Sequence, residues 1–370
     1  MELLTYSVPC LFGLEGLVGD ELRRMDLKNV RVENGRVLFD GDLAAMARAN
    51  LRLRMGERVL LRLGTFPAGT FEELFQGVLA LPLEEFIPKN GAFPVKGHTL
   101  NSRLHSVPDC QAIVKKAAAK RLGEKYRLSW LPEDRETYQL QFAIMKDQAE
   151  IFLDTSGPGL HKRGWRAVGN DAPLRETLAA AMVTLARYRG RDTFWDPFCG
   201  SGTIVIEAAL AALNRAPGLG RRFAAEQWRS VPQDLWQAER RAAMDREFRG
   251  DYRILGRDND PESLAIARSN AKKAGVAHLI DFAEADATRA PLPEGGGVLV
   301  CNPPYGERML EQRSAQRLYQ QLGRRLADAA GWKQYIISSE PEFERYFGKP
   351  AVKKRKLYNG MILCNLYMYF

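Results

Sequence analysis

The segment Asn302-Pro303-Pro304-Tyr305 combines residue types suited to activating an amino group on a nucleobase. Such an amine is a poor nucleophile because its lone pair is delocalised into the ring. The side-chain carbonyl of Asn302 and the backbone carbonyl of Pro303 could accept both N–H groups and direct the lone pair toward a methyl donor. Consecutive prolines stiffen the turn, and Tyr305 offers a ring face for an extruded base. Asn302, Pro303 and Tyr305 are therefore predicted to catalyse the methylation of an exocyclic amine.

Two other interpretations of this segment stay open. A proline pair after a strand could simply form a stiff loop. The adjacent Cys301 could instead attack a pyrimidine ring carbon as a thiolate, as in some methylating enzymes. Strand alternation points the Cys301 side chain away from that of Asn302, and no neighbouring base is evident to activate the thiol. The pattern therefore favours amine methylation over the covalent route.

A second group of residues, Asp196-Pro197-Phe198-Cys199-Gly200-Ser201-Gly202-Thr203, follows a predicted strand and opens an apolar helix. Gly200 and Gly202 let the backbone pass close to a ligand whose anionic part faces the helix N-terminus. The third glycine of the G-x-G-x-x-G dinucleotide fingerprint is absent, and the chain has no G-x-x-x-x-G-K-[ST] loop. NAD, FAD and P-loop ATPase chemistry are therefore disfavoured.

Two further acids follow the next two predicted strands. Asp258 could accept hydrogen bonds from both hydroxyls of a ribose, and Asp286 from an adenine amine. Either acid alone could instead cap a helix, a role that fits Asp260 better than Asp258. With Asp196, the acids favour S-adenosylmethionine, which joins adenosine to an amino-acid end and has no pyrophosphate. The predicted cofactor residues are Asp196, Pro197, Gly200, Gly202, Asp258 and Asp286.

The charge balance indicates a polyanionic partner. The 370 residues include 54 Lys and Arg against 45 Asp and Glu, which gives a net charge of +9 and a pI near 9.3. Nucleic acid is the first candidate for the partner of such a chain, and a merely basic enzyme is the alternative. Two basic runs with neighbouring aromatic residues are predicted to contact RNA, with solvated charged faces as the other interpretation. They comprise Lys162, Arg163, Trp165 and Arg166, and Lys353, Lys354, Arg355 and Lys356.

The periodicity of apolar residues divides the chain into four parts. Residues 1–65 follow a β-α-β-β-α-β order typical of a ferredoxin-like unit, and residues 66–155 form a second small α+β unit. Residues 156–172 are a basic connector. Residues 173–370 alternate helix and strand, which predicts an α/β, doubly wound, Rossmann-like sheet. The functional segments follow strands of this last part.

Several classes of protein are disfavoured by what the sequence lacks. Its five cysteines are scattered singly, which argues against a disulfide framework or a zinc ribbon, and no metal is expected. No apolar stretch approaches the roughly 20 residues that a bilayer requires, and no targeting segment is evident at the start. We therefore expect a soluble, cytoplasmic protein with no membrane partner and no obligate protein partner.

These motifs resemble those of the class I, S-adenosylmethionine-dependent THUMP-domain methyltransferases that modify the N2 amine of guanosine in RNA. The resemblance covers nearly the whole chain, and its bacterial 23S ribosomal RNA branch is the most similar. It rests on the motifs above, the connector Leu160–Arg166, Ala216-Pro217-Gly218-Leu219, Asn302–Arg308 and Tyr358-Asn359-Gly360. It implies that residues 66–155 form a THUMP RNA-binding domain and residues 173–370 a class I methyltransferase domain.

The resemblance also implies a substrate and leaves alternatives. Ribosomal RNA is the expected partner, and transfer RNA is the second candidate because related THUMP enzymes methylate it. N6-adenine methylation of nucleic acid stays open, since N-P-P-Y is shared with adenine methylases. A non-catalytic RNA-binding assembly factor is a further alternative, which the retention of Asn302–Tyr305 and the cofactor acids disfavours. In the ribosomal RNA branch of this family, the larger enzyme has a second methyltransferase half that this chain lacks. The resemblance therefore does not imply the function of that second half.

Overall fold

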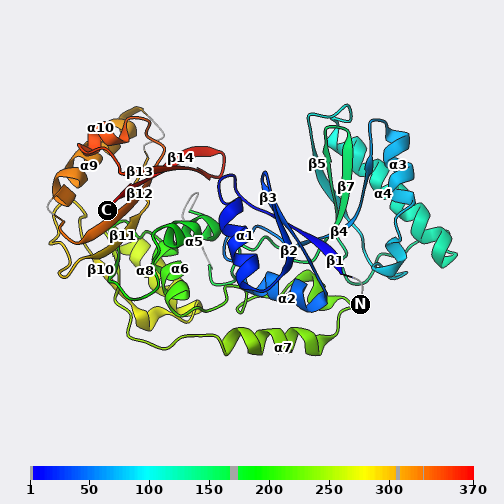
Figure 1. The fold of residues 1–370 in the computed structure, drawn as a ribbon, viewed down its shortest axis with the longest axis horizontal. Coiled ribbons are helices and arrows are strands. Elements are labelled where there is room, and N and C mark those ends of the chain that lie inside the picture. The colour runs from blue at the N-terminus through cyan, green and yellow to red at the C-terminus, as the bar shows by residue number, and fades with distance from the viewer. Residues whose placement is uncertain (1–2, 167–173, 306–308, 328) are drawn as a thin grey trace.

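The computed structural model describes residues 3–166, 174–305, 309–327 and 329–370, and it contains two seven-stranded sheets (Figure 1). The sheets lie side by side along the long axis, and the chain's N-terminal half occupies one end of the molecule. The predicted boundary between residues 172 and 173 lies outside the described residues. The described part confirms the predicted fold class, an α/β domain preceded by two small α+β units.

The N-terminal sheet is continuous across both small units. Its order is β2-β3-β1-β4-β7-β6-β5. Strand β4 crosses the predicted 65/66 boundary, pairing antiparallel with β1 on one side and with β7 on the other. The two units are therefore joined through a shared strand. The strands are β1 (Leu4–Pro9), β2 (Lys28–Glu33), β3 (Arg36–Gly41), β4 (Leu60–Pro67), β5 (Val95–Leu100), β6 (Leu140–Met145) and β7 (Gln148–Asp154).

Local sequence signals explain the elements of this half. Thr70 and Glu73 form a capping box that starts α3, and Asp42 caps α2. Strands β6 and β7 form a hairpin: Lys146 and Asp147 both have positive φ, at 51° and 60°, as the twist of a two-residue turn requires. The helices are α1 (Glu15–Arg24), α2 (Leu43–Arg52), α3 (Phe71–Leu79) and α4 (Val107–Tyr126).

The C-terminal sheet has the order β10-β9-β8-β11-β12-β14-β13. The first five strands are parallel, and β14 runs antiparallel to β12 and β13. The strands are β8 (Phe194–Asp196), β9 (Ile254–Asp258), β10 (Ile280–Glu284), β11 (Gly297–Cys301), β12 (Trp332–Ser338), β13 (Lys353–Asn359) and β14 (Ile362–Tyr369). The helices are α5 (Glu176–Leu185), α6 (Thr203–Ala212), α7 (Gln233–Met244), α8 (Pro261–Lys273), α9 (Met309–Ala327) and α10 (Phe343–Phe347).

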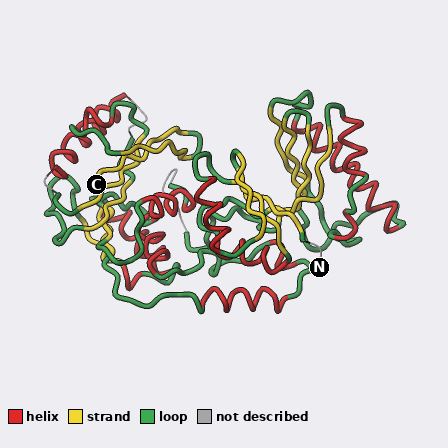
Figure 2. The backbone as a smooth tube through the Cα atoms, in the orientation of Figure 1, coloured by secondary structure: helices red, strands yellow, loops and turns green. Residues whose placement is uncertain are grey.

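Residues 214–250, between α6 and β9, attach the N-terminal half to the C-terminal sheet. Figure 2 shows their helix α7 along the lower edge of the molecule, joined on both sides by long loops. The Trp228 ring stacks on Tyr138 at 5.1 Å, and the indole N–H of Trp228 donates to the carbonyl of Thr137 at 3.0 Å. Arg48 of α2 pairs with Glu239 of α7 at 2.8 Å. This insertion thus contacts both N-terminal units, the first through Arg48 and the second through residues 137 and 138.

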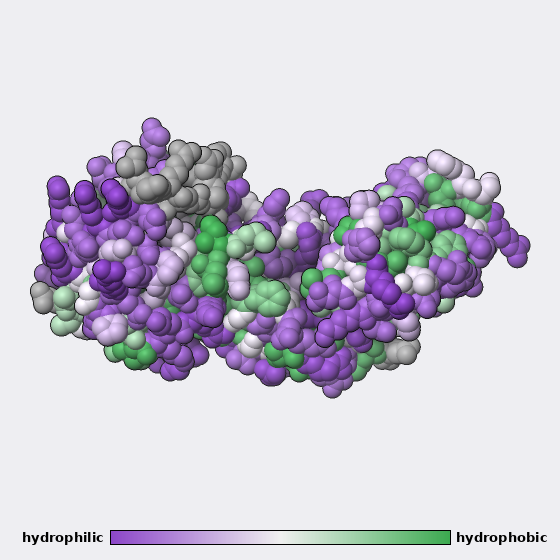
Figure 3. All heavy atoms as spheres, turned by 90° about the horizontal axis from the view of Figure 1, so that it is seen from above, coloured by the Kyte–Doolittle hydropathy of each residue, from purple (hydrophilic) through white to green (hydrophobic). Residues whose placement is uncertain are grey.

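The surface seen from above is mostly hydrophilic (Figure 3). Hydrophobic side chains gather near the middle of the long axis and over the arm that carries α3 and α4. No helix in the described part of the chain is long and apolar enough to cross a membrane. All five cysteines are free thiols.

Candidate active site

The two predicted groups of functional residues line one cavity of about 660 Å³ at the carboxyl edge of the C-terminal sheet. Strands β8, β9 and β11 are adjacent and parallel, so their carboxyl ends open on the same edge. Six predicted residues line the cavity: Asp196, Gly200, Asp258, Asn302, Pro303 and Tyr305. Pro197 and Gly202 shape the turn behind it.

The glycine turn presents backbone to the cavity. Gly200 has φ +49°, and a Cβ placed on it would meet no atom within 4 Å. Gly202 begins α6 with φ +87°, and a Cβ there would lie 3.1 Å from that of Ala267 in α8. Gly200 therefore leaves room for a ligand, whereas Gly202 permits close packing of two helices.

Asp196 is a buried carboxylate with a free acceptor. Its Oδ1 accepts the Phe198 N–H at 3.0 Å, while its Oδ2 has no hydrogen-bond partner in the structure. Burial raises the pKa of Asp196 well above its usual value, and the nearby Asp258 adds to that increase. An unpartnered buried carboxylate oxygen is a strong acceptor for an ammonium or N–H donor of a ligand.

Asp258 and Asp260 have separate roles, as expected. Asp260 is the N-cap of α8, and its carboxylate accepts the N–H groups of Glu262 and Ser263. The Asp258 carboxylate instead accepts the Gly200 N–H at 2.8 Å and the Asp260 N–H at 3.0 Å. Because a carboxylate has about four acceptor positions, Asp258 keeps capacity for hydroxyl groups of a ligand in the cavity.

Asp286 does not reach this cavity. It follows β10, which is the edge strand of the sheet, and its side chain is exposed. Its Oδ1 accepts both the N–H and the hydroxyl of Thr288, and Arg289 lies 3.6 Å from its other oxygen. These contacts place the Asp286 side chain in a local turn, and its contact with an adenine amine stays a prediction.

The Asn302–Tyr305 turn is held by two tyrosine hydroxyls. Tyr305 donates its hydroxyl to Oδ1 of Asn302, and Tyr319 of α9 donates to the carbonyl of Pro304 at 2.7 Å. Burial raises the pKa of Tyr305, so its hydroxyl remains a donor. A carbonyl oxygen has two lone pairs, so Asn302 can still accept an N–H from a ligand. Tyr305 thus orients Asn302 in addition to the predicted role of its ring.

The structure corrects the RNA-contact prediction for Arg163 and Trp165. Arg163 donates to Glu207 of α6 at 3.1 Å, and their side chains are 1% and 0% exposed. Arg163 also donates to the carbonyls of Leu160 and Arg54, and Trp165 is buried. Both side chains are enclosed by protein, so neither offers a surface to RNA.

The other two residues of the connector run lie nearer to solvent. Lys162 is exposed, and no ion pair with it is found among the described residues. Arg166 is partly buried; it pairs with Glu176 at 2.9 Å and donates to the Thr203 hydroxyl at 2.9 Å. RNA contact through Lys162 and Arg166 stays a prediction.

The run Lys353–Lys356 forms most of the edge strand β13, an element that the sequence pattern did not indicate. Lys354 pairs with Glu344 at 2.6 Å, and Arg355 donates to the carbonyl of Gly13 in the N-terminal half. Positive charge on an edge strand also discourages pairing with other chains. RNA contact stays a prediction for this run, of which Lys353, Lys354 and Lys356 are exposed.

Some residues of the site were not predicted. Asn359 at the end of β13 and Gly360 in the turn to β14 line the cavity, as do Leu174 and Arg175. Tertiary folding brings these segments to the cavity, and no local chemistry in the sequence indicates it. Glu207 did carry a signal, because a single acid inside an apolar helix requires a buried partner.

The comparisons with known proteins agree with this geometry. A family model described as "RMKL-like, methyltransferase domain" matches residues 163–368, which is more than half of the chain. The chain belongs to this family of methyltransferases. A model of the RlmL ferredoxin-like domain matches residues 5–60, and a THUMP domain model matches residues 68–154.

Two named methyltransferases are similar to this chain in sequence. The chain is 41% identical over its full length to "Putative RNA methyltransferase YpsC" of Bacillus subtilis, of which it covers 97%. It is 35% identical to the ribosomal RNA large subunit methyltransferase K/L of Psychromonas ingrahamii, over 99% of this chain and 50% of that protein. The chain therefore spans about half the length of the K/L relatives.

Several solved structures are similar over the whole chain. A "predicted N6-adenine-specific DNA methylase" from Listeria monocytogenes has a TM-score of 0.95 and 43% identity, with coverage of 100% of this chain and 97% of that one. SMU.472, whose crystal structure is complexed with SAH, has a TM-score of 0.94 and 39% identity, with coverage of 100% and 98%.

Proposed function

We propose that the protein transfers a methyl group from S-adenosylmethionine to the exocyclic N2 amine of a guanosine in RNA, with large-subunit ribosomal RNA as its substrate. The observation that carries the proposal is a single cavity lined by both the glycine turn and the Asn302–Tyr305 turn. Methylation of a nucleobase amine requires that the amine is held beside the methyl donor. The Asn302–Tyr305 turn would hold the amine, and the glycine turn would hold the donor.

S-adenosylmethionine is the cofactor. The similar protein SMU.472 was crystallised with SAH, and the residues present here fit such a molecule. Gly200 leaves open space beside its backbone, Asp196 has an unpartnered buried acceptor, and Asp258 has free acceptor capacity at the rim. When bound, the cofactor supplies an electrophilic methyl group on a sulfonium. We propose that Asp196 receives its amino-acid end and Asp258 its ribose hydroxyls.

The chain's own residues would orient the target amine. Asn302 and the Pro303 carbonyl accept its two N–H groups, and the hydroxyl of Tyr305 fixes the Asn302 side chain. The hydrogen bond from Tyr319 to the Pro304 carbonyl keeps the turn in place. The amine itself is the nucleophile, so no covalent intermediate with the protein is needed.

The choice of RNA and of guanine rests on the family. The THUMP match supports RNA, and the names of the K/L relatives support ribosomal RNA of the large subunit. The Listeria relative's name points instead to adenine N6 in DNA. The turn geometry is compatible with either amine, so product analysis must decide.

The proposal is tested by incubating the purified protein with S-adenosylmethionine and unmodified ribosomal RNA, transfer RNA or DNA. Nucleosides are then analysed by mass spectrometry. N2-methylguanosine in large-subunit ribosomal RNA is expected. The same product in transfer RNA alone would move the substrate to transfer RNA, and N6-methyladenosine would overturn the guanine assignment. Absence of cofactor binding by calorimetry would favour a non-catalytic assembly factor.

Asp258→Ala is expected to weaken binding of S-adenosylmethionine, because it deletes a charged acceptor for the ribose hydroxyls. The loss should be about 1–3 kcal/mol in binding free energy, measured by titration calorimetry. Asp260→Ala is the matched control: it removes the α8 cap, so it should lower thermal stability and leave affinity nearly unchanged. If Asp258→Ala lowered stability without changing affinity, Asp258 would have only a structural role.

Cys301→Ser is expected to retain most of the methylation rate. Cys301 is fully buried, and burial together with the nearby Asp196 raises the pKa of its thiol well above the usual value. The residue is therefore a neutral thiol rather than a nucleophilic thiolate. The rate should be measured alongside a search for a protein–RNA adduct in the wild type. An inactive but folded variant, together with such an adduct, would indicate ring-carbon methylation.

A further inference from the structure

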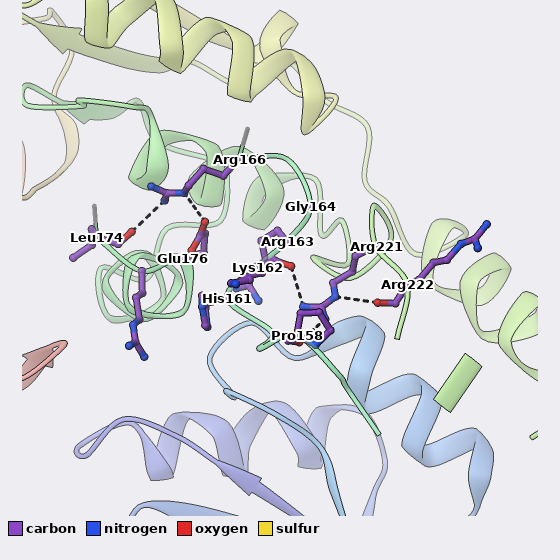
Figure 4. A pocket seen from close by; sticks show the side chains of 11 residues that line it. Pro158, His161, Lys162, Arg163, Gly164, Arg166, Leu174, Glu176, Arg221 and Arg222 are labelled. Carbon is purple, nitrogen blue, oxygen red and sulfur yellow. Dashed lines mark hydrogen bonds and ion pairs between the residues drawn. The ribbon is translucent and has the colours of Figure 1, made fainter. Parts of the chain in front are cut away.

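A second cavity, of about 630 Å³, adjoins the candidate active site and has a basic lining (Figure 4). It is formed by residues 158–166 of the connector, by residues 174–176 at the start of α5 and by Arg221 and Arg222 of the insertion before α7. Its cationic residues are Lys162, Arg163, Arg166, Arg175, Arg221 and Arg222. The proposed function assigns no role to this cavity as a whole.

Half of these cations are neutralised by carboxylates and half are not. Arg163 pairs with Glu207, Arg166 with Glu176, and Arg175 lies 3.6 Å from Glu57. For the other three cations, no carboxylate partner is found in the described parts of the chain; they are Lys162, Arg221 and Arg222. The cavity therefore carries an uncompensated positive charge.

Arg221 is built into the wall of the cavity. Its guanidinium donates to backbone carbonyls, those of Ser156, Pro158, Gly159, Lys162 and Arg222. Burial and the neighbouring Arg163 lower the pKa of Arg221 to about 10, which leaves it charged at neutral pH. Arg221 thus fixes the connector and adds a positive charge, and no ion pair of its guanidinium with a carboxylate is found among the described residues; Asp154 and Glu226 act on it only from farther away. Lys162 and Arg222, in contrast, are exposed and free to contact a ligand.

The basic residues extend away from the active site. Leu174 and Arg175 line both cavities, so the two cavities are neighbours at these residues. In Figure 4 the labelled residues run from Leu174, through Lys162 in the middle, to Arg222 at the opposite end. A strand whose target base entered the active site would bring its neighbouring phosphates to this series of cations.

We propose that this basic cavity binds the phosphate backbone of the RNA strand that flanks the target nucleotide. The proposal rests on the proposed function, because it presumes an RNA substrate. Contacts to phosphates position a strand without reading its sequence, which suits side chains that project from a connector. Arg175 would meet the phosphate nearest the base, Lys162 the next part of the strand and Arg222 the part farthest from the active site.

The test compares two double variants that each remove two positive charges. Lys162→Gln with Arg222→Gln alters the cavity. Lys272→Gln with Lys273→Gln is the control, at the end of α8. That helix ends just before β10 begins, so the control charges lie at the amino edge of the sheet, opposite the active site. Binding of a labelled single-stranded RNA oligonucleotide of mixed sequence is measured over a range of salt concentrations.

Each phosphate neutralised on a single strand contributes roughly 0.7 to the slope of log affinity against log salt. The cavity variant should therefore bind RNA more weakly and lose about 1.4 from the magnitude of this slope. The control should keep the wild-type slope, and so should Lys162→Arg with Arg222→Lys. Cofactor affinity should be unchanged in all of them, which shows that the proteins are folded.

Failure of this proposal is distinguishable from failure of the proposed function. If the wild type methylates RNA but the cavity variant keeps the wild-type slope, the RNA follows another path and the proposal is overturned. An equal loss of slope in the control would also overturn it, since net charge alone would then explain the effect. If the wild type neither binds nor methylates RNA, the proposed function fails and the phosphate site with it.

Discussion

Asn302→Ala is expected to slow methyl transfer by roughly 10²-fold or more while changing cofactor affinity by no more than a few-fold. The variant removes the side-chain acceptor that we propose for the target amine. It also leaves the Tyr305 hydroxyl without its partner. Single-turnover rates with excess enzyme, combined with calorimetry of S-adenosylmethionine, separate the chemical step from cofactor binding.

Tyr305→Phe provides the matched comparison. It retains the ring that lines the cavity and removes only the hydroxyl that orients Asn302. A smaller loss of rate is expected, because Asn302 remains present but is less well fixed. A wild-type rate in Asn302→Ala would remove the proposed mechanism. A loss in Tyr305→Phe as large as that in Asn302→Ala would show that the orienting hydroxyl matters as much as the acceptor itself.

The predicted residues that line one cavity share one property: each lies at the end of a predicted strand of a parallel sheet or directly after it. Asp196, Asp258 and Asn302 all come directly at or after strands that turned out to be neighbours. In a parallel sheet the carboxyl ends of all strands lie at the same edge. The local sequence pattern was therefore sufficient to predict that these residues lie close together. Asp286 follows β10, the edge strand, and is not among the residues that line the cavity; the local sequence pattern does not predict the order of strands in a sheet.

The errors came from contacts between distant parts of the chain. The basic connector has the composition of a solvated, RNA-facing segment, yet Arg163 is buried against α6 and the backbone of Arg54. Strand β13 was missed because a run of lysines has low strand propensity. It pairs along its length with the more apolar strand β14. In both cases tertiary packing outweighed the local signal.

Arg163→Met is expected to lower the free energy of unfolding by about 3–5 kcal/mol, because it leaves the buried Glu207 carboxylate without its partner. Urea unfolding followed by tryptophan fluorescence measures the change. The double variant Arg163→Met with Glu207→Leu should recover most of the loss, since it removes both buried charges. A surface role in RNA binding predicts the opposite pattern: near wild-type stability in the single variant and a reduced salt dependence of RNA affinity.

The pH dependence of this loss distinguishes an unpaired charge from a packing defect. Burial already raises the pKa of Glu207, although Arg163 opposes the shift, so removing Arg163 should raise that pKa further. A carboxyl group whose pKa is higher in the folded state than in the unfolded state favours folding at low pH and opposes it as the pH rises. The difference in stability between wild type and Arg163→Met should therefore shrink as the pH falls toward the usual pKa of glutamate, where Glu207 becomes neutral in the variant. A loss that stayed constant with pH would mean that Arg163 contributes through its packing and its hydrogen bonds to carbonyls, and not through its charge.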